Sequence, residues 1–193
     1  MLFAMLCAET EYGNPSGRER LEECILQMAG GAADTLAVLY EQTKTAVYGF
    51  ALSILRNQAD AEDVLQETYL HIYQAAGRYK PNGNPMPWIF TITRNLALMK
   101  IRESKRQDEL PAEDSAVFWA EDSALSAEDR LVLGAAMREL ADEERQILML
   151  HAVTGMKHRE IAELLQLSLS TVLSKYHRAL KKLRKCLGGE ERP

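Results

Sequence analysis

Cysteines are few in this sequence, and long apolar runs are missing altogether. Cys7, Cys24 and Cys186 are widely spaced and form no C-x-x-C pair, so neither a disulfide framework nor a zinc site is indicated. No apolar segment approaches the roughly 18–20 residues that a membrane-spanning helix requires. The apolar start of the chain has no basic flank, which argues against a signal peptide. We therefore expect a cytoplasmic protein with no membrane insertion.

The residue arrangements that support catalysis or metal binding are also missing. The acidic residues near the basic segments form no two-metal cluster, and no Ser/His/Asp, Cys/His or glycine-rich-loop arrangement is present. His151, His158 and His177 lie near one another, but no Cys or Glu at ligand spacing accompanies them. We expect no catalytic residues, no metal and no cofactor, and hence a protein that is not an enzyme.

Glycine and proline are scarce as well. Eleven Gly and six Pro among 193 residues are too few for a collagenous or low-complexity chain. An apolar fraction of 47% and a charged fraction of 26% are typical of a globular chain with a buried core. The length suits one medium domain or two small ones.

The net charge of −5 is distributed unevenly along the chain. Residues 1–76 carry 4 basic and 11 acidic side chains, residues 77–106 carry 7 basic and 1 acidic, and residues 107–129 carry 8 acidic side chains only. Residues 157–187 carry 8 basic and 2 acidic side chains. Two basic segments separated by an acidic one suggest two contacts with a polyanion. The alternative is that they are solvated helix faces.

Apolar residues recur at helical spacing almost throughout, and no segment alternates convincingly with period two. In the first half the pattern predicts a helix at 18–28 and helices over 34–56, 60–76 and 88–105. Asp60 is the predicted N-cap of the third of these, Met99 is predicted to face the core, and Lys80 to Pro87 (KPNGNPMP) is a loop by its Pro, Gly and Asn content. In the second half the pattern predicts helices over 127–139, 142–153, 158–165 and 169–186.

The predicted fold is therefore all-α, with two small helical domains joined by an acidic linker. We expect an N-terminal extension over 1–29, a first domain over 30–106, the linker over 107–126, a second domain over 127–187 and a tail over 188–193. The second domain is predicted to contain a helix-turn-helix.

The helix-turn-helix prediction comes from Lys157 to Leu187 (KHREIAELLQLSLSTVLSKYHRALKKLRKCL). Ala162 supplies the small residue that two closely crossing helices need, Gln166 takes the turn position that requires positive φ, and Ser168 caps the second helix. Val172, Tyr176 and Leu180 are expected to face inward. The polar and basic residues that turn outward suit base edges and phosphates in a major groove: Ser170, Thr171, Ser174, Lys175, His177, Arg178 and Lys181. The alternative is a helical hairpin used for protein contacts.

Two further surfaces are predicted in the first domain. The helix over 60–76 turns Val64, Leu65, Thr68, Tyr69 and Ile72 to one side. The other side carries what we term the acidic strip: Asp60, Asp63, Gln66, Glu67 and Leu70. An exposed Leu among carboxylates and amides favours a protein interface over a solvated face. The next helix is basic and follows a loop with two Asn and nearby aromatic rings, which is equipment for holding single-stranded nucleic acid.

Two motif blocks resemble bacterial RNA polymerase sigma factors of the sigma-70 family. Asp60–Glu67 (DAEDVLQE), followed by Trp88 to Leu98 (WIFTITRNLAL), is similar to the second conserved region. Met137 to Leu150 (MRELADEERQILML), with the helix-turn-helix after it, is similar to the fourth region. Because no domain lies between them, the chain resembles the small extracytoplasmic-function (ECF) group. The resemblance covers about residues 30–106 and 127–187.

The resemblance implies a role for each surface. The acidic strip would dock on the clamp helices of the largest catalytic subunit of core RNA polymerase. Melted minus-ten promoter bases would be captured by Lys80, Asn82, Asn84, Trp88, Thr91, Arg94, Asn95 and Arg102. The minus-thirty-five element would be contacted by Arg159, Ser168, Ser170, Thr171, Ser174, Lys175, His177, Arg178 and Lys181. Together these surfaces would bind core polymerase and direct promoter recognition, promoter melting and transcription initiation.

The partners that follow are core RNA polymerase, promoter DNA and, as is common among relatives, an anti-sigma protein, with the free chain a monomer. A stand-alone helix-turn-helix transcriptional regulator is the main alternative. It would account for residues 157–187 equally well and predicts a dimer, but it leaves DAEDVLQE and the basic helix after it unexplained. An enzyme acting on nucleic acid is disfavoured because no catalytic arrangement is present.

Overall fold

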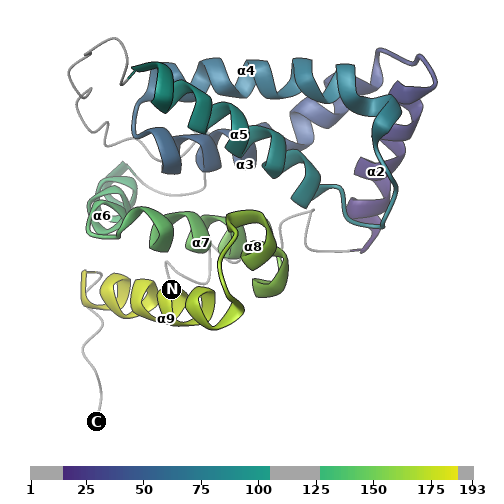
Figure 1. The fold of residues 1–193 in the computed structure, drawn as a ribbon. Helices are drawn as coiled ribbons and strands as arrows, with labels where there is room; N and C mark the ends of the chain where they lie inside the picture. Colours follow the sequence, from purple (N-terminus) through teal and green to yellow (C-terminus); the bar gives the residue numbers. More distant parts are fainter. Residues whose placement is uncertain (1–14, 105–126, 187–193) are drawn as a thin grey trace.

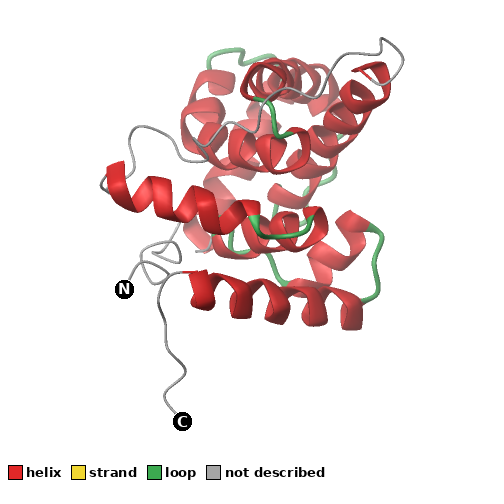
Figure 2. Cartoon of the chain, turned by 90° about the vertical axis from the view of Figure 1, so that its left-hand side faces the viewer, coloured by secondary structure: helices red, strands yellow, loops and turns green. Residues whose placement is uncertain are grey.

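The computed structural model describes residues 15–104 and 127–186, and the regular elements of both ranges are all helical (Figures 1 and 2). The first group comprises α2 (Pro15–Ala29), α3 (Thr35–Leu55), α4 (Gln58–Ala75), the short 3₁₀ helix η2 (Ala76–Arg78) and α5 (Met86–Ser104). The second comprises α6 (Ala127–Arg138), α7 (Asp142–Ala152), α8 (His158–Leu165) and α9 (Leu169–Cys186). The all-α prediction is confirmed. No helix in these ranges has the length and apolar content to cross a bilayer. The predicted linker and the predicted tail, Gly188 to Pro193, lie outside the described residues.

Most predicted helix boundaries agree with the structure to within two residues, but the predicted cap of α4 is wrong. Asn57, not Asp60, is the N-cap, because its side-chain Oδ1 accepts the backbone N–H of Asp60 at 3.1 Å. Asn and Asp are comparably good caps, so the sequence offers both positions. Asp60 lies instead in the first turn, where its carboxylate favours the positive end of the helix dipole.

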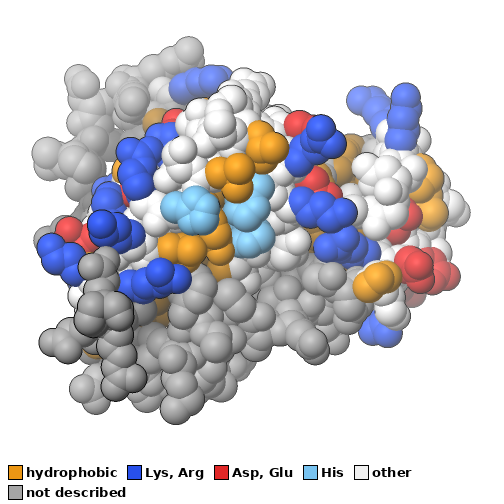
Figure 3. Space-filling model, turned by 90° about the horizontal axis from the view of Figure 1, so that it is seen from below, with side chains coloured by type: hydrophobic (Ala, Val, Ile, Leu, Met, Phe, Trp, Pro, Cys, Tyr) orange, Lys and Arg blue, Asp and Glu red, His pale blue; other side chains and the backbone are white. Residues whose placement is uncertain are grey.

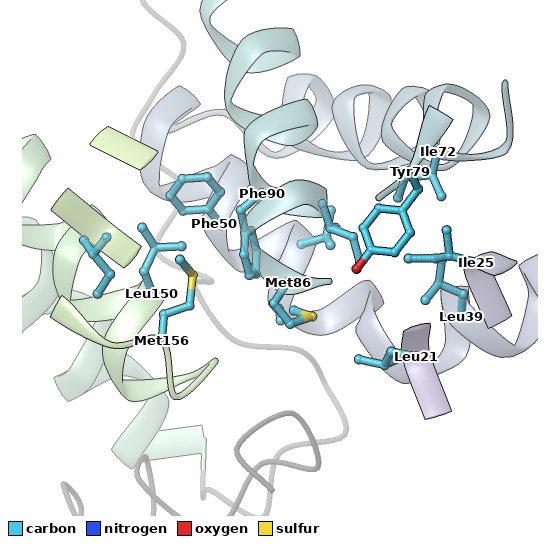
Figure 4. Close-up of a cluster of buried hydrophobic side chains, with 14 of the residues drawn as sticks. Leu21, Ile25, Leu39, Phe50, Ile72, Tyr79, Met86, Phe90, Leu150 and Met156 are labelled. Atoms are coloured by element: carbon cyan, nitrogen blue, oxygen red, sulfur yellow. The ribbon is translucent and has the colours of Figure 1, made fainter. Parts of the chain in front are cut away.

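Helices α3, α4 and α5 pack on one another, and α2 closes one end of this group (Figure 1). Phe50 of α3 meets Phe90 of α5 edge to face, with ring centroids 5.2 Å apart. Leu21 and Ile25 of α2 join the same core (Figure 4). The predicted helix at 18–28 is therefore present as α2, and it is part of the packed structure.

Met99 was expected in the core but is 50% exposed. The buried stripe of α5 includes Ile89, Thr93 and Leu96 with Ala97. Met99 lies two residues beyond Ala97, which rotates it about 200° around the helix and away from that stripe.

The two groups pack directly against each other through α3 and α7. The core of the first group continues into the second at Leu150 and Met156 (Figure 4). A Cβ built on Gly49 of α3 would lie 2.8 Å from Met149 Cε of α7. The end of the Met149 side chain fills the space beside Gly49, so a side chain at position 49 would require this flexible end to shift.

Arg145 of α7 is the buried charge at this contact, with only 3% of its surface exposed. Its guanidinium donates to the carbonyls of Met137 (3.1 Å), Leu140 (2.9 Å) and, across to α3, Ser53 (3.3 Å). Asp142 Oδ1 lies 3.5 Å from it and also accepts from Arg56, which follows α3. One side chain thus satisfies carbonyls from both groups.

Replacing Arg145 with Met should lower the free energy of unfolding by about 2–4 kcal/mol, because three carbonyls at a buried contact lose their donor. Urea denaturation followed by far-UV circular dichroism measures this loss. The matched control is Arg138→Met at the exposed end of α6, which we expect to change stability by less than about 0.5 kcal/mol. Equal losses in the two variants would contradict the assignment.

Candidate nucleic-acid interface

The acidic strip occupies the solvent side of α4, as predicted. Asp63, Gln66 and Glu67 are exposed, and Leu70 is 59% exposed. The opposite side of α4 buries its apolar residues, including Val64 and Ile72, against α3 and α5. Leu70 is the most exposed of the large apolar side chains in the described residues.

Lys100 of α5 is a member of this surface that sequence reasoning missed. Its Nζ lies 2.7 Å from Asp63 Oδ2 and 3.5 Å from Asp60 Oδ1. The hydrogen bond to Asp63 raises the pKa of Lys100 above its ordinary value, although partial burial opposes the shift. Lys100 therefore stays charged and fixes one side of the strip. The contact joins positions 37 apart in sequence, so no local pattern indicated it.

Loop 80–87 and the start of α5 form one wall of a pocket of about 420 Å³. Four of the predicted minus-ten residues line it, namely Asn82, Asn84, Trp88 and Thr91. Lys80, Arg94, Asn95 and Arg102 lie elsewhere: Lys80, Asn95 and Arg102 are exposed and Arg94 is half-buried. The predicted set is therefore only partly gathered in one place.

The facing wall of this pocket comes from α8, through Glu160, Glu163 and Leu164. Asn84 Nδ2 donates to Glu160 Oε1 at 2.9 Å, while Asn84 Oδ1 is buried without a hydrogen-bond partner among the described residues. Glu160 thus occupies the amide donor of Asn84, and the amide oxygen is enclosed at the same place. Sequence reasoning did not anticipate that α8 would face the loop.

The helix-turn-helix is formed by α8, a tight turn and α9. Gln166 adopts φ 58° and ψ 40°, the left-handed conformation that was predicted for this position, and the N–H of Leu167 bonds back to the carbonyl of Ala162 at 2.9 Å. Ser168 Oγ accepts the N–H of Thr171 at 3.1 Å, which confirms the predicted cap. Val172 is buried, as expected.

The polar face of α9 is directed to solvent. Figure 3 shows Lys and Arg gathered on both sides of a histidine group on the face viewed from below. The exposed members of the predicted set are Arg159, Ser168, Ser170, Ser174, His177, Arg178 and Lys181, whereas Thr171 and Lys175 are half-buried.

Three basic residues of α9 are paired with acids of α7. Lys175 lies 2.7 Å from Glu143, Lys182 lies 2.7 Å from Glu144, and Arg178 lies 3.7 Å from Glu144. Burial raises the pKa of Glu144, but hydrogen bonds from Lys182 and the Ala141 N–H outweigh it, so the net pKa is lowered. Charge counting by segment could not reveal this pairing, because it links segments far apart in sequence.

Two histidines, His151 of α7 and His158 of α8, pack against each other and against α9. The rings of His151 and His158 lie 4.2 Å apart, and Tyr176 packs against both at 4.8 Å. His158 Nε2 is buried with no hydrogen-bond partner in the described ranges. Burial, followed by the nearby charges of His151 and His177, lowers the pKa of His158. In the described residues no three His, Cys, Asp or Glu side chains are grouped to hold a metal.

Comparison with known proteins matches both helical groups to one family. Residues 39–107 match Sigma-70 region 2, and residues 130–183 match Sigma-70 region 4. The chain is 31% identical over 182 residues to the ECF RNA polymerase sigma factor SigK of Mycobacterium ulcerans, covering 91% of this chain and 97% of that protein. This chain belongs to the ECF sigma factors. The dimeric-regulator alternative is thereby set aside, because the match includes the first group as well.

A further curated protein and two solved structures are also similar to this chain over most of its length. SigK of Mycobacterium tuberculosis is 27% identical over 186 residues, covering 91% of this chain and 97% of the relative. The structure of CnrH in complex with the cytosolic domain of CnrY aligns with a TM-score of 0.64 at 22% identity, over 89% of this chain and 99% of that one. Sigma factor RpoE of Bartonella quintana, solved with the anti-sigma factor NepR, aligns with a TM-score of 0.67 at 23% identity, over 79% and 96%.

The family match gives the elements their function. Region 2 spans α3 from Leu39 through α5, and region 4 spans α6 to α9. The protein is a sigma factor that directs transcription initiation by RNA polymerase. Helix α2 precedes the region 2 match, although it packs into the same core.

The His158 environment predicts a pH dependence of this sigma factor's stability. Its pKa is lowered in the folded state, so below its ordinary value of 6.5 the unfolded chain binds a proton that the folded protein does not. Stability is therefore lost as pH falls through this range. We expect His158→Phe, which keeps a ring, to lose less stability than wild type between pH 7.5 and 5.5 in urea titrations.

His71, exposed on α4, provides the matched control. His71→Gln also removes one histidine, and the stability of this variant should follow the wild-type pH profile. If His158→Phe retains the full pH dependence of wild type, the folded-state pKa of His158 is not lowered as stated.

Proposed function

We propose that this sigma factor divides promoter recognition among three surfaces. The acidic strip binds core RNA polymerase, loop 80–87 with α5 captures melted minus-ten bases, and the N-terminal part of α9 reads the minus-thirty-five element. The observation that carries the proposal is the presence of region 2 and region 4 in one chain, each with polar groups displayed on a fixed helical frame. Recognition then requires both DNA contacts at a set spacing, which two weak sites joined on one polymerase provide.

The polymerase contact is supported by the shape and charge of α4. Leu70 gives the strip an apolar anchor, and the surrounding Asp63, Gln66 and Glu67 give it polar specificity. Protein interfaces often concentrate their binding energy in a few such anchors within a polar rim. The partner proposed here is the pair of clamp helices of the largest catalytic subunit.

The minus-ten contact is supported by the pocket beside loop 80–87. Two asparagines supply donors and acceptors for a base edge, and Trp88 supplies an aromatic surface. Basic residues along α5, including Arg94 and Arg102, would hold the phosphates of the melted strand. Trapping a base outside the stack offsets the cost of opening the duplex.

The minus-thirty-five contact is supported by the geometry of α8 and α9. Ser168 and Ser170 place hydroxyls at the N-terminus of α9, where backbone N–H groups favour a phosphate. Thr171 and Ser174 follow on the first turns and would reach base edges in the major groove. Lys181 and Arg178 would contact the sugar-phosphate backbone of the DNA.

We also propose the domain division expected from the sequence, with residues 30–106 and 127–187 as the two working domains on either side of an acidic linker. An anti-sigma protein is a further proposed partner, and the support is that RpoE was solved bound to one. Such a partner would act by covering the strip or the DNA surfaces. The free chain is proposed to be a monomer that performs no chemistry of its own.

The polymerase contact predicts that Glu67→Arg with Leu70→Ala weakens binding to bacterial core RNA polymerase at least about tenfold, because an anchor is lost and a charge is reversed. Fluorescence anisotropy of the labelled sigma factor measures the affinity, and run-off transcription should fall in parallel. Asp63 is left unchanged so that its ion pair with Lys100 stays intact.

Glu62→Arg is the control, since Glu62 is exposed on α4 outside the strip. It reverses the same charge and should bind core polymerase as wild type does. Binding that is unaffected in the double variant, or equally weakened in the control, would refute the assignment of the strip.

The minus-thirty-five contact predicts different effects of a phosphate and a base contact. Lys181→Ala should weaken holoenzyme binding by about 1 kcal/mol, roughly fivefold, at every minus-thirty-five sequence. Ser174→Ala should instead change the ranking of sequences. Selection from a randomised promoter library by holoenzyme distinguishes the two, with Lys185→Ala at the far end of α9 as a control. Unchanged ranking in Ser174→Ala, together with unchanged affinity in Lys181→Ala, would contradict this reading of α9.

A further inference from the structure

Glu22 of α2 makes a set of contacts that lies outside the region 2 match, which begins at residue 39. Its Oε1 accepts the phenol O–H of Tyr79 at 2.7 Å and the backbone N–H groups of Asn82 at 2.8 Å and Gly83 at 3.0 Å. Its Oε2 lies 3.3 Å from the N–H of Gly83. A single carboxylate on α2 therefore binds both ends of the turn that begins loop 80–87.

The backbone of the loop is shaped for this carboxylate. Gly83 has φ 77°, a left-handed conformation, and the N–H groups of residues 82 and 83 point to the same oxygen, Glu22 Oε1. Successive backbone N–H groups arranged in this way form an anion-binding concavity, and here the anion is a side chain of the same molecule. A residue with a Cβ at position 83 would be strained in this conformation.

The protonation states of Glu22 and Tyr79 favour strong hydrogen bonds between Glu22 and its donors. Burial raises the pKa of Glu22, but the hydrogen bonds from Tyr79, Asn82 and Gly83 outweigh it, so the net pKa is lowered and the carboxylate stays ionised. Burial and the hydrogen bond to Glu22 raise the pKa of Tyr79, so the phenol keeps its proton. Hydrogen bonds to an ionised acceptor are about twice as strong as neutral ones.

Two of the three groups that Glu22 holds, Tyr79 and Asn82, are connected to the pocket beside loop 80–87. The Tyr79 ring packs on Trp88 with centroids 4.9 Å apart, and Asn82 Oδ1 accepts the N–H of Asn84 at 3.0 Å. Asn82, Asn84 and Trp88 all line the pocket. Glu22 itself is fixed, because its neighbours Leu21 and Ile25 are buried in the core.

We propose that Glu22 is a positioning residue for minus-ten recognition, which holds loop 80–87 in the conformation that receives a promoter base. This inference rests on the proposed role of that loop. Holding the loop before DNA arrives removes an ordering cost from base capture and fixes which base edges the two asparagines can reach. Loss of Glu22 should therefore reduce discrimination at the minus-ten element specifically.

The test uses holoenzyme reconstituted from core polymerase and full-length Glu22→Gln, with Glu19→Gln as the matched control. Glu19 is exposed one turn earlier on α2. Transcription is measured on a promoter and on versions altered at single minus-ten or minus-thirty-five positions. We expect Glu22→Gln to reduce the preference for the correct minus-ten base about tenfold, while core affinity and minus-thirty-five preference match the Glu19→Gln control.

Two further variants keep the outcome clear. Tyr79→Phe removes one hydrogen bond to Glu22 and should give a smaller loss of minus-ten preference. It replaces Glu22→Gln if Glu22→Gln unfolds below the assay temperature. Glu22→Asp keeps the charge and should restore part of the minus-ten preference. A parallel fall of core affinity and both promoter preferences would mean that Glu22 only stabilises the fold, and would overturn the proposal.

Asn84→Ala separates this inference from the proposed function. If Asn84→Ala reduces minus-ten preference and Glu22→Gln does not, the positioning role is wrong while the role of the loop stands. If neither variant changes the preference, loop 80–87 does not capture minus-ten bases, and both statements fail. A loss in both variants supports the positioning role.

Discussion

The close contact between α3 and α7 is the constraint on which the rest of the structure depends. Met149 of α7 packs its side-chain end against Gly49 of α3, and Arg145 satisfies carbonyls on both sides of the contact. Because the apolar core continues across it, the region 2 and region 4 groups share one packed interior. The two groups also meet where Asn84 of loop 80–87 donates to Glu160 of α8. The pocket beside loop 80–87 therefore has walls from both regions.

The sequence predicted the features that local physics decides. Helical periodicity gave most boundaries, and the turn before α9 followed from Ser168 and the left-handed Gln166. The local prediction was wrong for the N-cap of α4, because Asn57 and Asp60 are both suitable capping residues. It was also wrong for Met99, which lies outside the buried stripe of α5. Contacts such as Lys100 with Asp63 or Glu22 with Gly83 join residues tens of positions apart. Tertiary packing alone brings such residues together, so periodicity and caps contain no sign of them.

The three candidate surfaces share one mode of construction. Each displays its polar groups from one element and is steadied by a charged residue from another. Lys100 of α5 steadies the acidic strip of α4, Glu22 of α2 steadies loop 80–87, and Glu144 of α7 steadies α9. A surface held in this way loses less conformational freedom on binding, since its side chains and backbone are already ordered in the free protein.

The ion pairs between α7 and α9 also affect how many counterions are released from DNA when α9 binds it. Lys175, Arg178 and Lys182 already have carboxylates of Glu143 and Glu144 beside them. A phosphate that approaches these cations must compete with an acid that cannot diffuse away, so the exchange releases fewer small ions than a count of lysines and arginines indicates. The dependence of region 4 binding on salt should accordingly be shallower than the charge of α9 alone would give.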